Sequence, residues 1–346
     1  MAGRRSKQQL ESDISGHLAA ARQARQCLTA KDRSSRRRLY SWAERGRLVN
    51  PAPGCFADPE QWAALSEVDK TLFIMRAIQR QNPHYLFCGP SAAVAWGLYE
   101  PARYIARPFV ATSPVAHSSS SKCLVRMGLP ETERGELVDG LHVTDLVRSA
   151  FDGARILGFR RGLGLCDRAA LFEGLSAADL LKRFEGMPRA RGAAVARRCA
   201  SRANPLSENG GESYVRAAMI GLGFAEPILQ VPIADPMDAW RDPYRADFFW
   251  TGDVVDREVL LTALANGALG TGEASGCIAG ELDGWGKTFD PRLTGGRGAR
   301  HQLLAERRRE ARLTRYGIRV VRFSFEEACD DAYFSRLLDS YGVPRV

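Results

Sequence analysis

The stretch CIAGELDGWGKTFD, residues 277–290, decides how the C-terminal part of this chain is interpreted. A short apolar run ends in Glu281 and, two residues later, in Asp283, and Lys287 follows. Acids at positions i and i+2 of a strand point to the same face, so the pattern predicts that these two carboxylates lie side by side. Two interpretations stay open: a catalytic strand edge, or a strand that ends in a polar turn.

The segments around this strand predict a small α/β unit. A helix over 210–222 carries Glu212 in its first turn, and strands over 227–235 and 244–250 follow, the second with Asp247 in its middle. After the Glu281 strand come a helix over about 299–316, a fourth strand and a final helix. This order can bring acids from the first helix and the two middle strands to one place.

Acids gathered in this way suit phosphodiester hydrolysis. Carboxylates hold Mg²⁺ through a few direct oxygens, and the ion activates water and screens the charge that grows on phosphate. A neighbouring lysine can orient the water or stabilise the phosphate. The candidate catalytic residues are Asp247, Glu281, Lys287 and Glu212, and the candidate metal ligands are Asp247, Glu281 and Asp283.

Composition and charge limit the classes of function that this chain can have. The chain has 346 residues, 45% of them apolar, and a formal charge of +9. Residues 1–50 hold twelve Lys/Arg and four Asp/Glu, so most of the surplus is N-terminal. A basic end on a nearly neutral body favours a polyanion partner such as nucleic acid, and a solvated basic tail is the commoner alternative. We expect a cytoplasmic protein without a membrane segment. Eight scattered cysteines make a structural zinc site improbable.

The basic end has internal organisation. After a helix over about 9–27, the segment 29–58 predicts a helix over 35–46, capped by Ser34 or Ser35, and a small hairpin at Pro-Ala-Pro-Gly. Helix, basic helix and hairpin is the layout of a winged helix-turn-helix. The alternative is a basic appendage that packs on the next domain. The candidate DNA-binding residues are Arg36, Arg37, Tyr40, Ser41 and Arg45.

The whole chain is expected to be α/β, mixed and multi-domain. We expect a winged-helix DNA-binding domain over 1–58, a middle α+β domain over 59–200 and a nuclease-like α/β domain over 205–346, with a polar joint at 201–209. The middle domain offers no catalytic constellation. Its CGPSAAVAWGL segment resembles the Gly-Ser turn of nucleotidyltransferases without the paired aspartates, and His142 fits a surface or partly buried histidine better than a catalytic base.

The order E…D…ExDG…K…ExxRE…GxxVxR, from Glu212 to Arg322, resembles the restriction-endonuclease-like PD-(D/E)XK superfamily, and within it the branch of very-short-patch repair endonucleases. The segments 33–57, 88–98, 139–152 and 211–223 resemble actinobacterial proteins that join an abortive-infection-type antitoxin winged helix to such a domain. The resemblance implies that Asp247 and Glu281 hold metal, that Glu212 supports them, and that Lys287 is the base or phosphate contact.

This chain departs from the superfamily motif in two places. The motif keeps lysine two residues after the second acid, where this sequence has Asp283, so Lys287 must reach back from the following loop. The stretch 252–277 is also longer than a tight hairpin and can hold a helix or a strand.

Two function classes follow from these sequence patterns, with a third in reserve. The first is a Mg²⁺-dependent endonuclease acting on double-stranded DNA. The second is a DNA-binding regulator of the antitoxin type, paired with a cognate toxin, whose nuclease-like domain serves recognition. The third is an RNA-directed nuclease. Acids clustered closely enough to share one ion favour hydrolysis, whereas acids on opposite faces favour the regulator.

Overall fold

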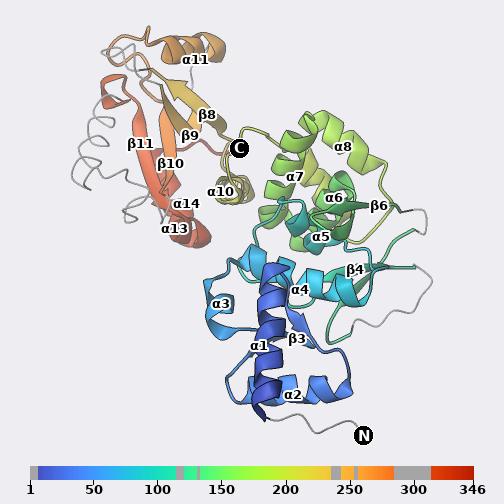
Figure 1. Ribbon diagram of the computed structural model, residues 1–346. Helices are drawn as coiled ribbons and strands as arrows, with labels where there is room; N and C mark the ends of the chain where they lie inside the picture. The colour runs from blue at the N-terminus through green and yellow to red at the C-terminus, as the bar shows by residue number, and fades with distance from the viewer. Residues whose placement is uncertain (1–6, 114–120, 131–132, 235–242, 253–255, 284–312) are drawn as a thin grey trace, which may run out of the picture. The chain divides into compact units, whose positions relative to one another are not determined.

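The computed structural model describes residues 7–113, 121–130, 133–234, 243–252, 256–283 and 313–346. The chain divides into two compact units, each of which combines helices with strands (Figure 1). The N-terminal unit holds Met1–Gly158 and Ala177–Ser201, and the C-terminal unit holds Phe159–Ser176 and Arg202–Val346. The expected mixed α/β class is therefore confirmed.

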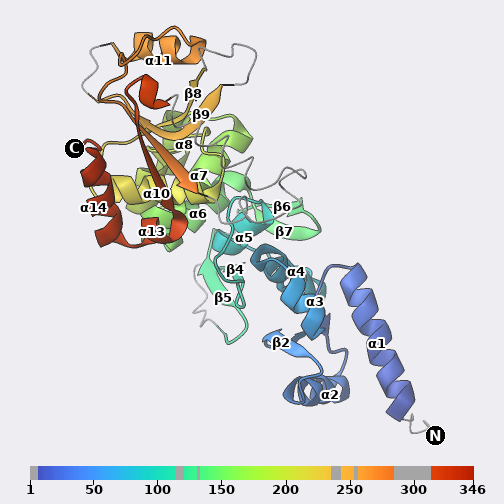
Figure 2. The same cartoon turned by 90° about the vertical axis from the view of Figure 1, so that its left-hand side faces the viewer.

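The N-terminal unit begins with a helix, a strand, a helix and a hairpin. These are α1 (Lys7–Gln23), β1 (Leu28–Thr29), α2 (Arg33–Glu44), β2 (Val49–Ala52) and β3 (Cys55–Ala57). The three strands form an antiparallel sheet in the order β1-β3-β2. Leu39, Leu48 and Phe56 are buried together and attach α2 to the hairpin. Figure 2 shows α1 and α2 at the N-terminal end of the chain.

Helix α2 begins earlier than the sequence pattern predicted. Asp32, rather than Ser34 or Ser35, is its N-cap: the Asp32 carboxylate accepts from Ser35 N at 2.7 Å, and Asp32 N donates to Ser35 Oγ at 3.0 Å. This reciprocal capping box satisfies two backbone donors at once, which a lone serine cap does not. Helix α1 also ends earlier than expected, at Gln23, because the chain then turns through Arg25, which has a left-handed φ of 49°, before β1 begins.

The rest of the N-terminal unit alternates helices with two small two-stranded sheets. Its helices are α3 (Pro59–Ala64), α4 (Glu67–Gln81), α5 (Gly89–Ala95), α6 (Leu146–Leu157), α8 (Ala177–Glu185) and α9 (Ala193–Ala200). Its further strands are β4 (Phe109–Thr112), β5 (Val125–Gly128), β6 (Gly135–Val138) and β7 (Leu141–Thr144). Strands β4 and β5 are parallel, whereas β6 and β7 are antiparallel. His142 is exposed on β7.

The C-terminal unit is built on a four-stranded sheet. Its strands are β8 (Ile228–Ile233), β9 (Tyr244–Trp250), β10 (Ile278–Asp283) and β11 (Arg319–Ser324). Its helices are α7 (Phe159–Glu173), α10 (Gly210–Gly221), α11 (Arg257–Asn266), α13 (Phe325–Cys329) and α14 (Asp331–Tyr341). The order is β11-β10-β9-β8, antiparallel from β8 to β10 and parallel between β10 and β11.

Both faces of this sheet are covered. Helices α10, α13 and α14 share one buried cluster with the strands, represented by Met219, Phe248 and Phe334. Helix α11 packs through Leu264 in a second cluster that includes Phe249. The long stretch between the two acid-bearing strands therefore contains a helix that covers the sheet. Figure 1 shows α11 at the sheet end opposite α13.

Helix α7 belongs to the C-terminal unit, although the sequence placed 59–200 in one middle domain. A Cβ added at Gly164 would lie 3.2 Å from Ser213 Cβ, so the glycine lets α7 approach α10 closely. None of the helices in the described ranges is long and apolar enough to cross a membrane.

Candidate functional site

Four side chains stand in one row across the C-terminal sheet. Leu229 pairs with Phe248 and Val231 with Ala246, so Gln230 lies opposite Asp247. The pairing of β9 with β10 ends at Gly280 and Phe248, which puts Glu281 at the next position, beside Asp247. Glu281 pairs in turn with Arg322 on β11. The row Gln230, Asp247, Glu281 and Arg322 therefore gathers two of the predicted acids on adjacent strands.

The Asp247 carboxylate is held by the backbone of the neighbouring strand. Its Oδ2 accepts a hydrogen bond from Leu282 N at 3.0 Å. Leu282 directly follows Glu281, so this bond fixes the Asp247 carboxylate next to the Glu281 position. A carboxylate bound to backbone has less rotamer freedom than one on an open surface, which suits a group that must hold a ligand in place.

Glu281 is buried and both of its carboxylate oxygens have protein partners. The Tyr244 hydroxyl donates to Oε1, and Arg322 Nη2 makes an ion pair with Oε2 at 2.7 Å. Charge-assisted bonds of this kind are short and fix the orientation of a carboxylate. A cation bound here would have to share the carboxylate with Arg322 or displace it.

Glu212 lies in the first turn of α10, 4% exposed, and accepts three hydrogen bonds. Glu208 N donates to its Oε2 at 2.8 Å, Asn209 Nδ2 donates to Oε1 at 2.6 Å, and Gln230 Nε2 donates to Oε2 at 3.3 Å. Burial raises the pKa of Glu212 to about 7, and the negative charge of Asp247 contributes to the rise. Glu212 and Asp247 therefore lie close enough for their charges to interact.

Replacing Glu212 should change how stability depends on pH. Folded Glu212 keeps its proton up to about pH 7, whereas the unfolded carboxyl releases it near 4.5. Between pH 4.5 and about 7 the unfolded state binds fewer protons than the folded state. The contribution of Glu212 to the free energy of unfolding therefore falls as pH rises through this range. Glu212→Gln should lose that fall, as measured by urea unfolding across the window. Glu258→Gln, an exposed acid of α11, is the matched control, and parallel curves for Glu212→Gln and wild type would contradict the assignment.

Gln230 is a site residue that sequence reasoning missed. It is buried, and its backbone has φ 55°, a left-handed conformation that non-glycine residues seldom adopt. Such strain persists where the surroundings determine the residue's position, often at functional sites. The signal available in the sequence was one long polar side chain inside the apolar strand PILQVPIAD. Gln230 connects the row on the sheet to Glu212 on α10.

The structure describes one of the other two residues predicted from the opening stretch, Asp283, and does not describe Lys287. Asp283 is the last residue of β10, opposite Ser324, and is exposed whereas Glu281 is buried. The side-by-side pair expected from the ExD pattern therefore spans two environments. Lys287 lies outside the described residues.

The described carboxylates can be compared with what Mg²⁺ requires. In the described ranges no group of three or more His, Cys, Asp or Glu side chains is arranged to hold a metal ion. Mg²⁺ keeps several waters and is usually held by one or two carboxylates, together with substrate phosphate. Asp247 and Glu281 supply that number of carboxylates on adjacent strands, and both oxygens of Glu281 already have Tyr244 and Arg322 as partners.

The predicted DNA-binding residues lie on or directly after α2. Arg36, Arg37 and Arg45 are exposed, and Ser41 is half-buried. A depression of about 410 Å³ lies along this helix. It is lined by Arg33, Arg36, Arg37, Tyr40, Ser41 and Glu44. The helix thus presents several cations side by side, which is the arrangement that neutralises neighbouring phosphates.

Tyr40 has a position that the sequence did not indicate. Its hydroxyl accepts from Gly54 N at 3.0 Å, and its ring meets Phe56 edge to face at 5.0 Å. Both contacts join α2 to the hairpin. Arg36 lies 6.0 Å from the ring centre, so Tyr40 also supports a cation on the outer face. Tyr40 therefore orients α2 relative to the hairpin.

A scan of family models, a search of curated proteins and a search of solved structures each returned no match for this chain.

Proposed function

We propose that the chain binds double-stranded DNA through α2 and the β2–β3 hairpin, as a winged helix-turn-helix does. The support is the exposed row of arginines on α2 and the capping box that fixes its start. The hairpin is attached to the same helix through Tyr40 and Gly54, so both elements can contact one duplex as a unit. Phosphate neutralisation by Arg36 and Arg37 would supply most of the affinity.

We propose further that the C-terminal unit hydrolyses phosphodiester bonds in a Mg²⁺-dependent reaction, as the resemblance to PD-(D/E)XK endonucleases implies. The observation that carries this proposal is the placement of Asp247 beside Glu281 on adjacent strands, with buried Glu212 close by. Mg²⁺ would activate water and neutralise charge on the phosphate. Asp247 would bind the ion, Glu281 would share it, and Gln230 would orient Glu212.

Cleavage of plasmid DNA tests the catalytic proposal. Purified full-length protein is incubated with supercoiled plasmid and either Mg²⁺ or Mn²⁺, with a chelator as control, and single-stranded RNA is tested in parallel. We expect metal-dependent nicking or linearisation of the DNA. Protein that shifts DNA in a gel and never cuts it under either ion would refute the proposal. Cutting of RNA alone would assign the site to the other nucleic acid.

The second candidate is a DNA-binding regulator of the antitoxin type, with a cognate toxin as partner. It is favoured by one observation: Arg322 and Tyr244 already satisfy both oxygens of Glu281, which stabilises this carboxylate without a metal. The C-terminal unit would then serve recognition or assembly, because a fold can outlast its chemistry. Binding of DNA without cleavage is the result that distinguishes this candidate.

Replacing Arg36 and Arg37 together by Ala should weaken binding to duplexes of different sequence by similar factors, because both arginines are proposed as phosphate contacts. Each lost phosphate contact should also lower the slope of log affinity against log salt by about 0.9. Fluorescence anisotropy with a labelled duplex at several salt concentrations measures both quantities. Arg189→Ala with Arg191→Ala removes the same charge from an exposed loop of the same unit and should bind as wild type does. Unchanged binding after the α2 substitutions would exclude this helix as the contact.

A further inference from the structure

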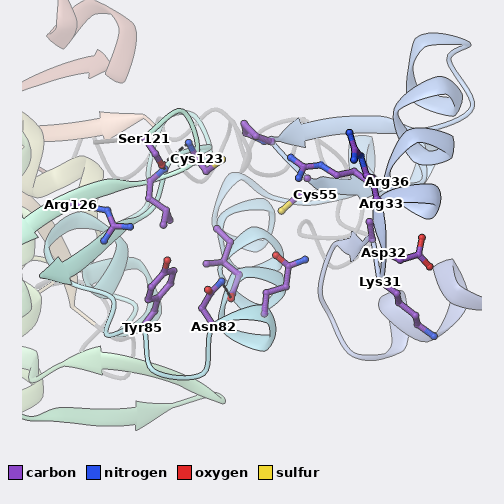
Figure 3. Close-up of a pocket in the computed structure, with 16 residues that line it drawn as sticks. Lys31, Asp32, Arg33, Arg36, Cys55, Asn82, Tyr85, Ser121, Cys123 and Arg126 are labelled. Carbon is purple, nitrogen blue, oxygen red and sulfur yellow. Dashed lines mark hydrogen bonds between the residues drawn. The ribbon is translucent and has the colours of Figure 1, made fainter. Parts of the chain in front are cut away.

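A second basic surface lies beside α2, inside the N-terminal unit. It is a groove of about 810 Å³, called the basic groove below. One wall is formed by residues 30–33 and Arg36 at the start of α2 and by the hairpin turn at 53–55. The other wall is formed by residues at the end of α4 and by Ser121, Cys123, Leu124 and Arg126 of the β5 segment. Figure 3 shows Arg33 and Arg36 on one side of the groove and Arg126 with Tyr85 on the other.

The groove is positively charged. Its lining contains the cations Lys31, Arg33, Arg36 and Arg126 and a single acid, Asp32. The hydrogen bond from Ser35 N lowers the pKa of Asp32, so this carboxylate stays ionised as the cap of α2. The four cations outnumber it and come from both walls. A ligand that bridges the walls therefore meets positive charge on each side, which favours a chain of phosphates over a neutral ligand.

The basic groove is continuous with the outer face of α2. Arg33 and Arg36 line both the groove and the depression that contains Arg37 and Tyr40. A phosphodiester strand carries one negative charge per nucleotide. When one phosphate contacts Arg37, the neighbouring phosphates of the same strand can therefore contact the cations of the groove. A free anion would occupy one end of this surface, whereas a nucleic-acid strand can use all of it.

We propose that the basic groove binds the backbone phosphates of DNA that flanks the segment contacted by α2, with Arg126 as the phosphate contact from the β5 wall. This inference rests on the proposed DNA binding and extends it, because it adds Arg126, which lies far beyond the helix-turn-helix segment in the sequence, to the DNA-binding surface. The site size on DNA would then exceed what α2 and the hairpin cover.

The test uses the full chain, a short duplex that α2 alone can cover, and the same duplex extended by one helical turn at each end. Anisotropy is measured across salt concentrations for wild type, Arg126→Glu and, on the opposite wall, Lys31→Glu. Each variant should lose affinity for the extended duplex at least tenfold and lower its salt slope by about 1, and should bind the short duplex nearly as wild type does. Arg189→Glu, an exposed site outside the groove, is the matched control for charge reversal.

Three results would overturn the inference. If both groove variants bind the extended duplex as tightly as wild type does, the groove does not bind DNA. The proposed function would still hold in that case if Arg36→Ala with Arg37→Ala loses DNA binding. If the wild-type protein binds no duplex at all, both the proposed DNA binding by α2 and the DNA binding by the groove are refuted. Binding of inorganic phosphate or a mononucleotide that Arg126→Glu abolishes, with DNA binding unchanged, would assign the groove to a small free anion.

Discussion

Asp247→Asn should abolish metal-dependent cleavage of DNA. A bound metal ion contributes several kcal/mol to phosphodiester hydrolysis, so loss of its ligand should reduce the rate by roughly a thousandfold or more. Asparagine keeps an oxygen that can accept from Leu282 N, as Asp247 Oδ2 does at 3.0 Å, so the sheet should remain intact. The rate of plasmid nicking under Mg²⁺ measures the effect.

Two controls separate lost chemistry from lost structure in this experiment. Glu258→Gln removes an exposed acid of the same unit and should cleave as wild type does. DNA affinity of Asp247→Asn should be unchanged, because the proposed DNA-binding surface lies in the other unit. Undiminished cleavage by Asp247→Asn would exclude Asp247 as a ligand to the ion.

Arg216→Met should destabilise the C-terminal unit by roughly 3–5 kcal/mol, the range for breaking a buried ion pair. Arg216 is 1% exposed. Its Nη2 donates to Asp167 Oδ1 at 2.6 Å, and its Nη1 donates to Glu226 Oε1 at 2.6 Å and to the Arg202 carbonyl at 2.8 Å. Burial raises the pKa of Asp167 while Arg216 opposes the rise, so without the arginine a buried carboxylate stays uncompensated.

Arg202 provides the matched control for Arg216, because it binds the same acid from the surface. Its side chain is 51% exposed, and its Nη1 lies 2.6 Å from Glu226 Oε2. Arg202→Ala should therefore cost less than about 1 kcal/mol. Hydrogen exchange of α7 and α10 measures both variants, since the Asp167–Arg216 pair joins these helices. Equal protection in Arg216→Met and wild type would show that apolar packing alone holds α7 in place.

Local elements were predictable where local chemistry decides them. The strand around Glu281 and the strand with Asp247 at its centre appear where the apolar runs placed them. The start of α2 was misplaced because Asp32 and Ser35 cap each other, and the choice among several cap candidates depends on that reciprocal geometry. For the stretch between the two acid-bearing strands the sequence allowed either a helix or a strand, because a short apolar run fits both the helical and the strand periodicity.

The candidate site was only half predictable. Asp247, Glu281 and Glu212 were identified by residue type and order along the chain. Gln230 and Tyr244 were missed, and Arg322 is named only as the end of the family motif and not as a partner of Glu281. Strand register brings all three to the acids from distant positions, and Gln230 also has a left-handed backbone. Tyr40 is a candidate DNA contact by its place on the basic helix, and its hydroxyl accepts a hydrogen bond from Gly54 of the hairpin turn.

By itself the sequence determined the mixed α/β class, the basic N-terminal helix with its hairpin, and the presence of acids on neighbouring elements of the C-terminal unit. These features depend on hydrophobic periodicity, turn residues and the placement of charges, all of which act between residues that are close together in the sequence. Only the tertiary structure decided that Asp247 stands beside Glu281, that Arg322 pairs with Glu281, and that α7 packs with α10. Register and buried ion pairs decide those features, and both join residues that are far apart along the chain.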